Sequence, residues 1–453
     1  GDAVFDISGL CVLTNYRVGL KYGTISKETM LNYVLNIYDE GKLVSVVVPG
    51  GSHGTHVAGI VGAYYKDDAS KNGVAPGCQF VSIKIGDTRL GTMETNQGLM
   101  RALYHIRENK CDLVNMSYGE PTTTVKTGCF PKGVESLVWK YGTIFISSAG
   151  NDGPCLSTAG APQSSTDAII GIGAMFSPQM VQSEYGIVQK GEDGQNVVNH
   201  YEAYSWSSRG PTMDGAIGVK IMCPGGAIAP VPEYTLNANQ LMNGTSMSSP
   251  NACGNVSLLL SALKQQGIKY SPYGIETALI NSANDNVLGK IDETARGYGL
   301  LQIAAAHEYC VKNQEFISGP VSRFEIGISG PNHKNARGIY VREAGIKRGA
   351  ISYGVFVTPK FHEDVSNEVK VKYQFKCALK TDCNWIEPAP FTLIATDGRY
   401  FEIKVDAFKV IQQNAMRYTP VFRGYILGLN NDDLSAGPLF RIPVTVCNPI
   451  KYP

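Results

Sequence analysis

The strongest constraint on the fold is the alternation of short apolar runs with helical patterns between about Gly51 and Cys310. The apolar runs are rich in Val and Ile and are apolar on both faces, as expected for the strands of a parallel sheet that is covered on each side. These runs are Gln79–Ile85, Asp112–Ser117, Thr143–Ser148, Ala168–Ala174 and Val219–Cys223. Strand and helix in alternation predict a doubly wound α/β domain.

Two of the segments between these runs carry an apolar stripe at helical spacing. The first stripe is Leu99, Leu103 and Ile106, and the second is Val256, Leu259, Leu260 and Leu263. Apolar residues three or four positions apart lie on one face of a helix. We therefore expect both segments to be helices that cover the sheet.

The pattern changes after about Val311. From Val369 to Lys380 apolar residues alternate with polar ones, mostly lysines, and Phe401–Val405 repeats the alternation before a last strand-like run at Arg441–Val446. A period of two predicts strands with one buried and one solvated face. We interpret the lysine row as a solvated strand face rather than a basic patch. Residues 311–453 are predicted to form an antiparallel, sandwich-like β-rich domain.

Charge and hydropathy exclude several classes of partner. The 40 basic and 39 acidic residues give a net charge of +1, which offers no general electrostatic reason to expect nucleic acid or an anionic membrane. No apolar run reaches the 18 residues of a spanning helix, and the first 30 residues lack the layout of a signal peptide. We expect no nucleic-acid and no membrane partner.

The cysteines indicate a reducing compartment. There are 11, an odd number, widely spaced and without a CxxC pair, so neither a disulfide framework nor a zinc site is indicated. No Asp-rich loop has the spacing of calcium ligands. We predict a cytoplasmic protein with no metal and no cofactor.

Three clusters of residues carry chemistry, and the first is Gly50–Gly59. It places His53 after a glycine turn and before small residues that allow a helix to pack closely. His53 and His56, three apart on a helix, could in principle be two metal ligands. Because neither an HExxH motif nor a third ligand follows, we favour a presented imidazole over a metal site.

The second cluster, Ser147–Pro154, follows an apolar strand directly and contains Asn151. An amide side chain at the carboxyl end of a parallel strand lies where open α/β sheets place their sites, and it can donate hydrogen bonds to an oxyanion without carrying charge. Asn-Asp-Gly is also a common turn sequence, so this cluster by itself leaves both interpretations open.

The third cluster, Asn243–Pro250, places Ser246 at a predicted helix N-terminus, where unpaired backbone N–H groups favour developing negative charge. A serine hydroxyl becomes a good nucleophile only beside a base, and His53 is the obvious candidate. Alone, such a serine would be an ordinary helix cap. With His53 upstream and Asn151 between them, nucleophilic catalysis is the better interpretation.

The motifs HGTHVAG, SSAGNDGP and GTSMSSP, in this order, resemble the subtilisin-like serine peptidases. The stretches IKIGDTRL, TMET, NMSYGE, QLMN, SSRGP and AGPLF extend the resemblance across nearly the whole chain, to the tripeptidyl-peptidase II family within them. The resemblance implies a subtilisin-like domain at 49–310, a cytosolic exopeptidase that removes tripeptides from peptides with a free N-terminus, and a large homo-oligomer as the assembled form.

The resemblance also implies roles for single residues. His53 matches the general base, Asn151 the oxyanion donor and Ser246 the nucleophile, while Glu94 and Glu120 match two glutamates that hold the ammonium group of the substrate. Two acids without a cation are costly to bury, so such a site should favour a cationic end group. Glu94 could instead complement a helix start, and Glu120 could be a solvated loop acid.

One part of the family pattern is missing. A complete triad needs a carboxylate that orients the histidine, and subtilisin-like chains carry it before the histidine in Asp-Thr-Gly or Asp-Ser-Gly, which this sequence lacks. Asp6 only loosely imitates that motif. Residues 1–48 resemble the end of an insertion within the peptidase domain, so we expect the acid to lie outside this chain. Alternatives to the exopeptidase are a subtilisin-like endopeptidase and a catalytically silent scaffold.

Overall fold

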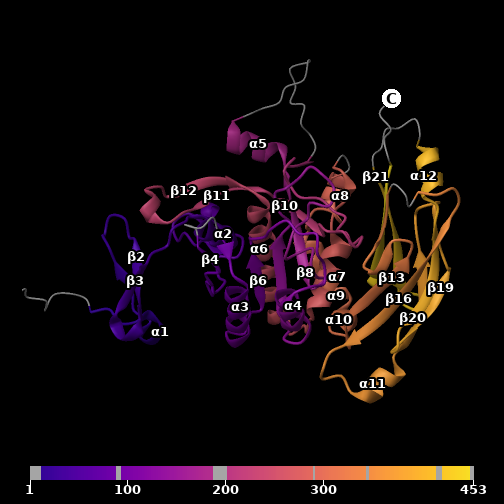
Figure 1. The fold of residues 1–453 in the computed structure, drawn as a ribbon, viewed down its shortest axis with the longest axis horizontal. Helices are drawn as coiled ribbons and strands as arrows, with labels where there is room; N and C mark the ends of the chain where they lie inside the picture. The colour runs from indigo at the N-terminus through magenta and orange to yellow at the C-terminus, as the bar shows by residue number, and fades with distance from the viewer. Residues whose placement is uncertain are drawn as a thin grey trace, which may run out of the picture.

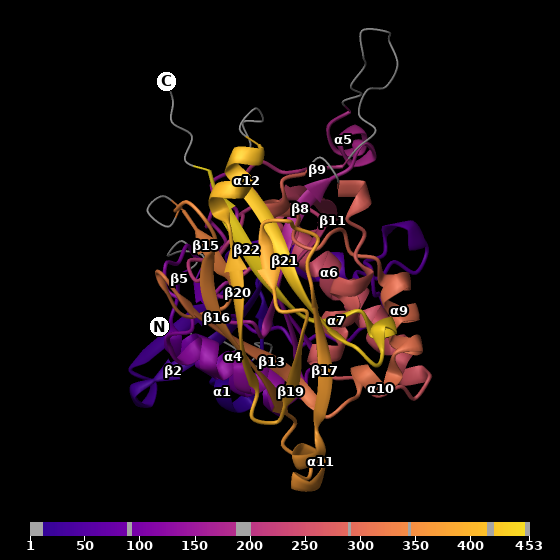
Figure 2. The same cartoon turned by 90° about the vertical axis from the view of Figure 1, so that its right-hand side faces the viewer.

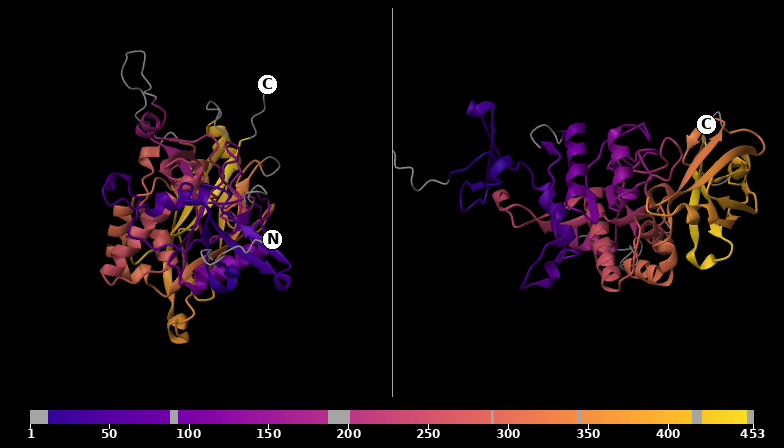
Figure 3. Two further views of the ribbon diagram at one scale, coloured as in Figure 1. Left: turned by 90° about the vertical axis from the view of Figure 1, so that its left-hand side faces the viewer. Right: turned by 90° about the horizontal axis from the view of Figure 1, so that it is seen from below.

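The computed structural model describes residues 12–87, 93–186, 201–288, 291–342, 346–414 and 421–448. Three parts follow one another along the longest axis: a small N-terminal sheet, a central α/β part and a C-terminal sandwich (Figures 1 and 3). Asp6, the weak candidate for the triad acid, lies outside the described residues. Within these ranges no helix is both long enough and apolar enough to cross a membrane.

The N-terminal part is a three-stranded antiparallel sheet in the order β1-β2-β3. Its elements are α1 (Tyr16–Gly19), β1 (Gly23–Thr24), β2 (Asn32–Tyr38) and β3 (Leu43–Val47). None of their residues is buried. Even the apolar residues Leu43, Val44 and Val46 are more than half exposed. The sheet therefore presents apolar side chains to solvent.

The central sheet is parallel, in the order β10-β8-β7-β6, with the short β9 (Glu202–Ala203) pairing antiparallel to β8. Its parallel strands are β6 (Leu113–Met116), β7 (Ile144–Ser148), β8 (Ile169–Phe176) and β10 (Ile221–Pro224). Every residue of β7 is buried, as the uniform apolar runs predict for a sheet covered on both faces. The predicted α/β architecture is confirmed.

Helices cover both faces of this sheet (Figure 1). On one face lie α6 (Thr245–Gln265), α7 (Pro272–Ser282), α9 (Ile303–Lys312) and α10 (Gln314–Ile317), and on the other α3 (Asn96–Glu108) and α4 (Cys129–Trp139). Val256 and Leu260 of α6 pack on Ile146 and Ile172 in one core. Leu103 of α3 belongs to the opposite core with Phe145 and Ile169. Both predicted apolar stripes are confirmed.

The remaining elements of the central part frame the carboxyl ends of the strands or connect the layers. They are α2 (His53–Gly62), β4 (Gly86–Asp87), β5 (Met93–Glu94), α5 (Pro178–Tyr185), β11 (Gly226–Pro230), β12 (Asn239–Asn243) and α8 (Glu293–Arg296). Short 3₁₀ turns are η1 (Asp39–Gly41), η2 (Ala69–Lys71), η4 (Glu233–Thr235), η5 (Asn286–Leu288) and η7 (Leu434–Ala436).

The predicted strand at Gln79–Ile85 is wrong, since this segment forms no strand in the structure. Ile83 and Ile85 pack against the α3–α4 core, whereas Phe80 and Val81 remain about half exposed, at 52% and 47%. A strand requires a neighbour that takes up its backbone hydrogen bonds. Strand β6 is the last of the described sheet and pairs only with β7, so the apolar run lacks the partner that would make it a strand.

The C-terminal part is a sandwich of two five-stranded sheets, which faces the viewer in Figure 2 with α12 at its upper end. One sheet has the order β14-β13-β16-β20-β18, with β13 (Val321–Gly330), β14 (His333–Ala336), β16 (Ile351–Phe361), β18 (Ile386–Pro388) and β20 (Arg399–Val405). The other has the order β15-β22-β21-β17-β19, with β15 (Ile339–Val341), β17 (Gln374–Lys380), β19 (Phe391–Ala395), β21 (Val421–Asn430) and β22 (Pro438–Cys447). All pairs are antiparallel except β15 with β22, and α12 (Ala407–Gln413) follows β20. The predicted β-rich sandwich is confirmed, with Phe401, Ile403 and Val405 buried in its core.

The predicted strand over Val369–Lys380 is only half correct. Residues Asn367–Lys372 form the short helix α11, and the strand begins at Gln374. The Ser366 side chain accepts a hydrogen bond from the Val369 N–H and caps the helix, while Glu368 and Lys372 form an i,i+4 ion pair of 2.7 Å. Val371 is 81% exposed, so no buried face enforces the period of two there.

Arg337 joins the sandwich to the central part from a buried position. Its guanidinium forms ion pairs with Asp214 at 2.7 Å and with Asp167 at 3.0 Å, and donates to the carbonyl of Ser164. Burial by itself would lower the pKa of Arg337, but the two carboxylates outweigh burial and raise it. The two parts are therefore connected by a charge cluster in which the cation is fully compensated.

Candidate active site

Ser246 is the second residue of α6 and lies directly after the β11–β12 hairpin. The side chain is half-buried and remains reachable. In the described residues no hydrogen bond is recorded for the Ser246 backbone N–H. A free N–H at a helix N-terminus is a ready donor for a negatively charged oxygen.

Asn151 follows strand β7 and is tied to the start of α6. Its side-chain oxygen accepts hydrogen bonds from the backbone N–H and the hydroxyl of Thr245, both at 2.9 Å. A Cβ on Gly244 would lie 3.7 Å from the Asn151 Nδ2 atom, so the amide nitrogen lies close to the turn before Ser246. Because its oxygen is occupied twice, the amide has a defined orientation that leaves the NH₂ group as a donor.

The turn that delivers Asn151 depends on Gly150. Its φ of +104° lies in the region that side-chain-bearing residues avoid, and a Cβ there would lie 2.8 Å from the Ser208 hydroxyl oxygen. The Gly150 N–H also donates to the Thr245 hydroxyl at 3.2 Å. The chain therefore turns sharply at the end of β7 and aims the amide at α6.

A second network, which the sequence analysis missed, holds Ser246 from the side of β6. The Ser117 hydroxyl donates to the Ser246 carbonyl at 2.8 Å and accepts from Asn115 Nδ2 at 3.0 Å. The Ser249 hydroxyl completes it by donating to Asn115 Oδ1 at 2.6 Å. The available signal was Asn115, a polar residue in an otherwise apolar strand, because a polar group placed there requires partners.

His53 is the first residue of α2, with an exposed ring. No hydrogen bond joins it to Ser246 or to a carboxylate in the parts of the chain that the structure describes, and the Ser246 hydroxyl instead donates to the Ser117 carbonyl at 3.4 Å. Partial loss of hydration, together with the like charge of His56, lowers the pKa of His53 below its ordinary value of 6.5. The neutral imidazole, which can accept a proton, is therefore favoured.

His56 is a buried residue that links α2 to β12. It is fully buried, and its Nε2 donates to the Gln240 carbonyl on β12 at 2.9 Å. A nitrogen that donates to a carbonyl carries its proton and is not free to bind a metal. Within the described ranges no three His, Cys, Asp or Glu side chains are grouped as metal ligands.

Helix α2 packs directly against α6, which places the His53 helix beside the Ser246 helix. Ile60 of α2 and Met247 of α6 share one buried cluster. A Cβ on Gly254 of α6 would lie 2.6 Å from the Val74 Cβ and 3.3 Å from the Val61 carbonyl, so only glycine permits this approach. The structure thus brings Ser246 and Asn151 together through Thr245 and places His53 on the neighbouring helix.

Glu94 and Glu120 lie on two different short β pairings. Glu94 ends β5 and pairs with Gly86, and its buried Oε2 has no hydrogen-bond partner among the described residues. Glu120 is exposed and forms an isolated antiparallel bridge with Ala161, in which the backbone hydrogen bonds measure 3.0 and 2.7 Å. No interaction of described residues links the two carboxylates, so their convergence on one ammonium group stays a prediction.

Comparison with known proteins supports the same fold and motifs. Residues 15–299 match the model of the subtilase family, and residues 322–447 match that of the tripeptidyl-peptidase II first Ig-like domain. The chain is 44% identical to "Tripeptidyl-peptidase 2" of Oryza sativa subsp. japonica over 97% of its length and 43% identical to that of Arabidopsis thaliana over 96%. It spans 31% of the length of each of these relatives.

A solved structure gives the same result. The crystal structure of tripeptidyl peptidase 2 is 32% identical and superimposes with a TM-score of 0.76, covering 97% of this chain and 32% of that one. The family model covers more than half of the chain, including the three motif clusters around His53, Asn151 and Ser246. The chain therefore belongs to the subtilase family, and the relatives named above, which match nearly its whole length, are tripeptidyl-peptidases 2.

Proposed function

We propose that this chain carries the catalytic groups of a serine exopeptidase that releases tripeptides from the free N-termini of peptides. The observation that carries the proposal is the fixed amide of Asn151 beside the start of α6. This amide has its oxygen engaged and its NH₂ group left as a donor, next to a reachable serine whose own N–H is unpaired in the described residues. Two such donors are what an oxyanion hole requires.

The chemistry follows from these positions. The Ser246 hydroxyl attacks the scissile carbonyl carbon while His53 takes its proton, and the carbonyl oxygen becomes an oxyanion that accepts hydrogen bonds from Asn151 Nδ2 and the Ser246 N–H. Collapse of this intermediate breaks the C–N bond, and the leaving amine takes the proton from His53. Water then attacks the acyl-enzyme by the same route and regenerates the Ser246 hydroxyl.

The exopeptidase assignment rests on Glu94 and Glu120. A buried carboxylate oxygen that has no partner among the described residues, as found at Glu94, is costly unless a cation or donor reaches it. The ammonium group of a substrate would supply both. Glu120 lies in the extended segment that follows Ser117, where a substrate backbone can pair with the chain. The names of the relatives, tripeptidyl-peptidase 2, support release of three residues.

The carboxylate that should orient His53 is proposed to come from outside the described residues. Among the described residues strand β6 pairs only with β7, and the apolar segment Gln79–Ile85, which packs against the α3–α4 core through Ile83 and Ile85, forms no strand. An additional strand at this edge would take up hydrogen bonds from both. The proposal therefore includes low activity for this chain alone.

Two further proposals concern the cellular compartment of the protein and its assembly into an oligomer. Nine cysteines of the described ranges, from Cys78 to Cys383, are free thiols, which favours a reducing compartment such as the cytoplasm. The exposed apolar side chains of β3 favour a covered surface in the assembled protein, in line with the large homo-oligomer implied by the family resemblance.

The decisive experiment compares one fluorogenic tripeptide with a free amine and with an acylated amine, using the complete protein. Cleavage of the free form alone supports the exopeptidase, and Glu94→Gln should then raise KM or lower kcat/KM for that form. Glu308→Gln, an exposed acid on α9, is the matched control. Equal cleavage of both forms would favour the subtilisin-like endopeptidase and contradict the ammonium site.

The remaining alternative, a catalytically silent scaffold, is favoured by the absence of a carboxylate beside His53 in the described residues. A phosphonofluoridate reagent separates it from the proposal. Covalent labelling of Ser246 in the complete protein, lost in Ser246→Ala, would show a live nucleophile. A complete protein that is folded but unlabelled would establish the scaffold instead.

A further inference from the structure

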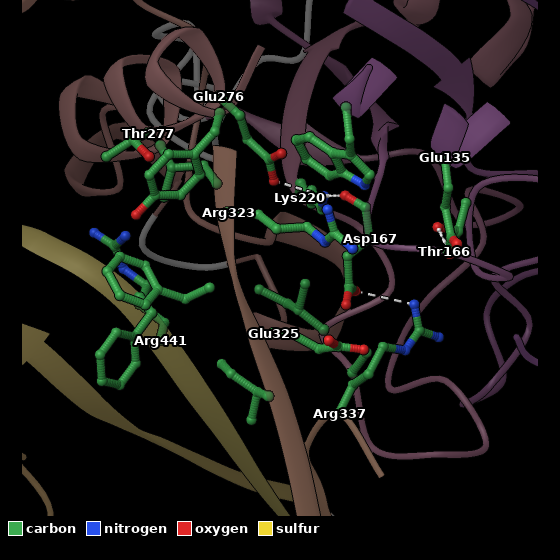
Figure 4. Close-up of a pocket in the computed structure, with 18 of the residues that line it drawn as sticks. Glu135, Thr166, Asp167, Lys220, Glu276, Thr277, Arg323, Glu325, Arg337 and Arg441 are labelled. Atoms are coloured by element: carbon green, nitrogen blue, oxygen red, sulfur yellow. Dashed lines mark hydrogen bonds and ion pairs between the residues drawn. The ribbon is translucent and has the colours of Figure 1, made fainter. Parts of the chain in front are cut away.

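A cavity of about 300 Å³ lies between the central part and the sandwich. Its walls come from α4 and α7, from Thr166 and Asp167 just before β8, and from β13 and β22, so both parts contribute to it. Figure 4 shows polar and charged side chains that line this cavity, among them Glu276 and Thr277 of α7 and Arg441 of β22. It is distant in sequence and in structural elements from the three motif clusters.

The lining carries more positive than negative charge. The cations are Lys126, Lys132, Lys220, Arg323, Arg337 and Arg441, and the acids are Glu135, Asp167, Glu276 and Glu325. Two of these cations are compensated inside the cavity: Lys220 by Glu276 at 2.5 Å and Arg337 by Asp167 at 3.0 Å. Glu325 is paired with Lys360, which is not part of the lining. The other four cations form no ion pair with a described residue.

Among these four, Arg441 is notable because its guanidinium is largely removed from water without a carboxylate partner among the described residues. It is half-buried, its one recorded hydrogen bond in the described residues goes from Nη2 to the Asn281 side-chain oxygen, and its guanidinium lies 5.0 Å from the centre of the Tyr298 ring. Burial lowers the pKa of Arg441, and the groups that oppose burial are tyrosines rather than carboxylates. A guanidinium removed from water in this way is stabilised by an anion that reaches its remaining N–H groups.

Arg323 and Tyr298 extend the same face. The Arg323 guanidinium lies 5.4 Å from the centre of the Trp139 ring and forms no recorded ion pair in the described part of the chain. The Tyr298 hydroxyl also has no recorded hydrogen-bond partner among those residues, so it is available as a donor. The rings of Phe324 and Phe440 contribute apolar surface to the cavity wall. The cavity thus combines donors and positive charge with aromatic surface.

We infer that this cavity binds a small organic anion, with Arg441 contacting a carboxylate or phosphate group and the aromatic side chains contacting its body. The volume exceeds that of one or two waters and suits a metabolite-sized ligand rather than a peptide. Such a ligand contacts α4 and α7 on one side and β13 and β22 on the other, so its binding stabilises the contact between the two parts. The inference is independent of the proposed peptidase chemistry.

The test uses the full chain, with inorganic phosphate and malonate as the phosphate and carboxylate probes and glycerol as the neutral probe. Trp139 lines the cavity, so binding is followed by its fluorescence and by titration calorimetry at constant ionic strength set with sodium chloride. We expect saturable binding of phosphate, malonate or both, and none of glycerol. The stronger of the two anions identifies the ligand group.

Arg441→Gln should weaken that binding by about tenfold or more, because a charge-assisted contact is lost. Arg101→Gln, an exposed arginine on α3, is the matched control and should bind as the unchanged chain does. Trp139→Phe should abolish the fluorescence change while calorimetry still detects binding. Arg323→Gln provides a second test should Arg441→Gln fail to fold, and it should also weaken binding.

Three outcomes would overturn the inference. They are the absence of binding of either anion, equal binding by the unchanged chain and the two cavity variants, and a response to phosphate that chloride reproduces at equal ionic strength.

Discussion

The two halves of the candidate site differ in how firmly they are held. On the oxyanion half, Asn151 is fixed by two hydrogen bonds from Thr245, and Ser246 is fixed through Ser117. On the base half, the ring of His53 is exposed and forms no hydrogen bond with a described residue. The proposed oxyanion half is therefore held in a defined geometry, whereas the proposed base half lacks an orienting partner among the described residues.

The two halves differ because the described residues contain the hydrogen-bond partner of Asn151 but not a carboxylate partner of His53. Asn151 follows β7 and its partner Thr245 begins α6, and one buried core holds these two elements together. If His53 is the general base, the partner that it needs is a carboxylate, because this partner must stabilise a positively charged imidazolium. Neutral amide side chains and backbone groups cannot replace that negative charge. If the acid comes from an added strand at β6, the base half is completed only when that strand is present.

The largest expected effects concern the base and the nucleophile. In the complete protein, Ser246→Ala and His53→Ala should each lower kcat for tripeptide release by about 10⁶. In this chain alone His53→Ala should lower the rate of Ser246 labelling by only about 10², because an unoriented imidazole contributes little and effects within a triad are not additive. The rate of phosphonofluoridate labelling, measured with and without His53→Ala in this chain and in the complete protein, compares the two effects of the substitution. An equal penalty in the two would contradict the comparison.

The next effect concerns the buried charge cluster of Arg337, Asp214 and Asp167, which joins the sandwich to the central part. Arg337→Met should lower the free energy of unfolding by about 3–5 kcal/mol, because it leaves Asp214 and Asp167 without their buried cation. Denaturant unfolding followed by circular dichroism measures the change, with the exposed Arg399→Met as control. A loss below about 1 kcal/mol would mean that the cluster does not hold the two parts together.

The same variant predicts a change in acid stability. Burial would raise the pKa of Asp214, but the hydrogen bonds and charge of Arg337 outweigh burial and hold the pKa below the ordinary 3.8. A lowered pKa contributes stability above the unfolded value, and this contribution is lost as the pH falls through the folded pKa. Below pH 3.8 the gap in stability between the unchanged chain and Arg337→Met should therefore narrow.

On the oxyanion half, Asn151→Leu should lower the labelling rate by about 10²–10³. Because this half is complete in the described residues, the penalty should be the same in this chain and in the complete protein. Asn237→Leu, an exposed residue of the β11–β12 hairpin loop, controls for the change of residue type. A penalty found only in the complete protein would show that the amide is not preorganised here.

The smallest expected effect is a shift in pH dependence. The pKa of His53 lies below 6.5 in this chain because of lost hydration and the like charge of His56. A base acts in its neutral form, so the acid limb of the labelling rate should lie below pH 6.5. A carboxylate neighbour favours the charged form and raises the pKa, so the limb should move to higher pH in the complete protein. Identical limbs would argue against an added acid.

The sequence analysis was most successful where the signal is local. The apolar runs at β7 and β8 and the stripe on α6 predict buried strands and a covering helix, because periodicity alone decides which face is apolar. It failed at Gln79–Ile85, where strand formation depends on a neighbour, and at Val369–Lys372, where a Ser366 cap and a Glu368–Lys372 pair outweigh the alternation.

The candidate site residues were predicted from the same kind of local signal. The local motifs pointed to His53, Asn151 and Ser246, but not to the roles of Asn115 and Ser249, which belong to the Ser117 network. Their side chains become informative only when β6 and α6 are adjacent. The cavity around Arg441 was equally out of reach, because its residues come from helices and strands that are far apart in the chain.

The sequence by itself determined the elements and their order: a covered parallel sheet, a β sandwich, and three clusters that resemble a serine peptidase. The tertiary structure alone decided that Thr245 locks Asn151 across a separation of 94 residues, that Arg337 is fully compensated, and that Arg441 is not. Dihedral preferences and apolar periodicity act between near neighbours and can be inferred along the chain. Hydrogen bonds and ion pairs between distant residues depend on packing, which exists only once the sheet and its helices have assembled.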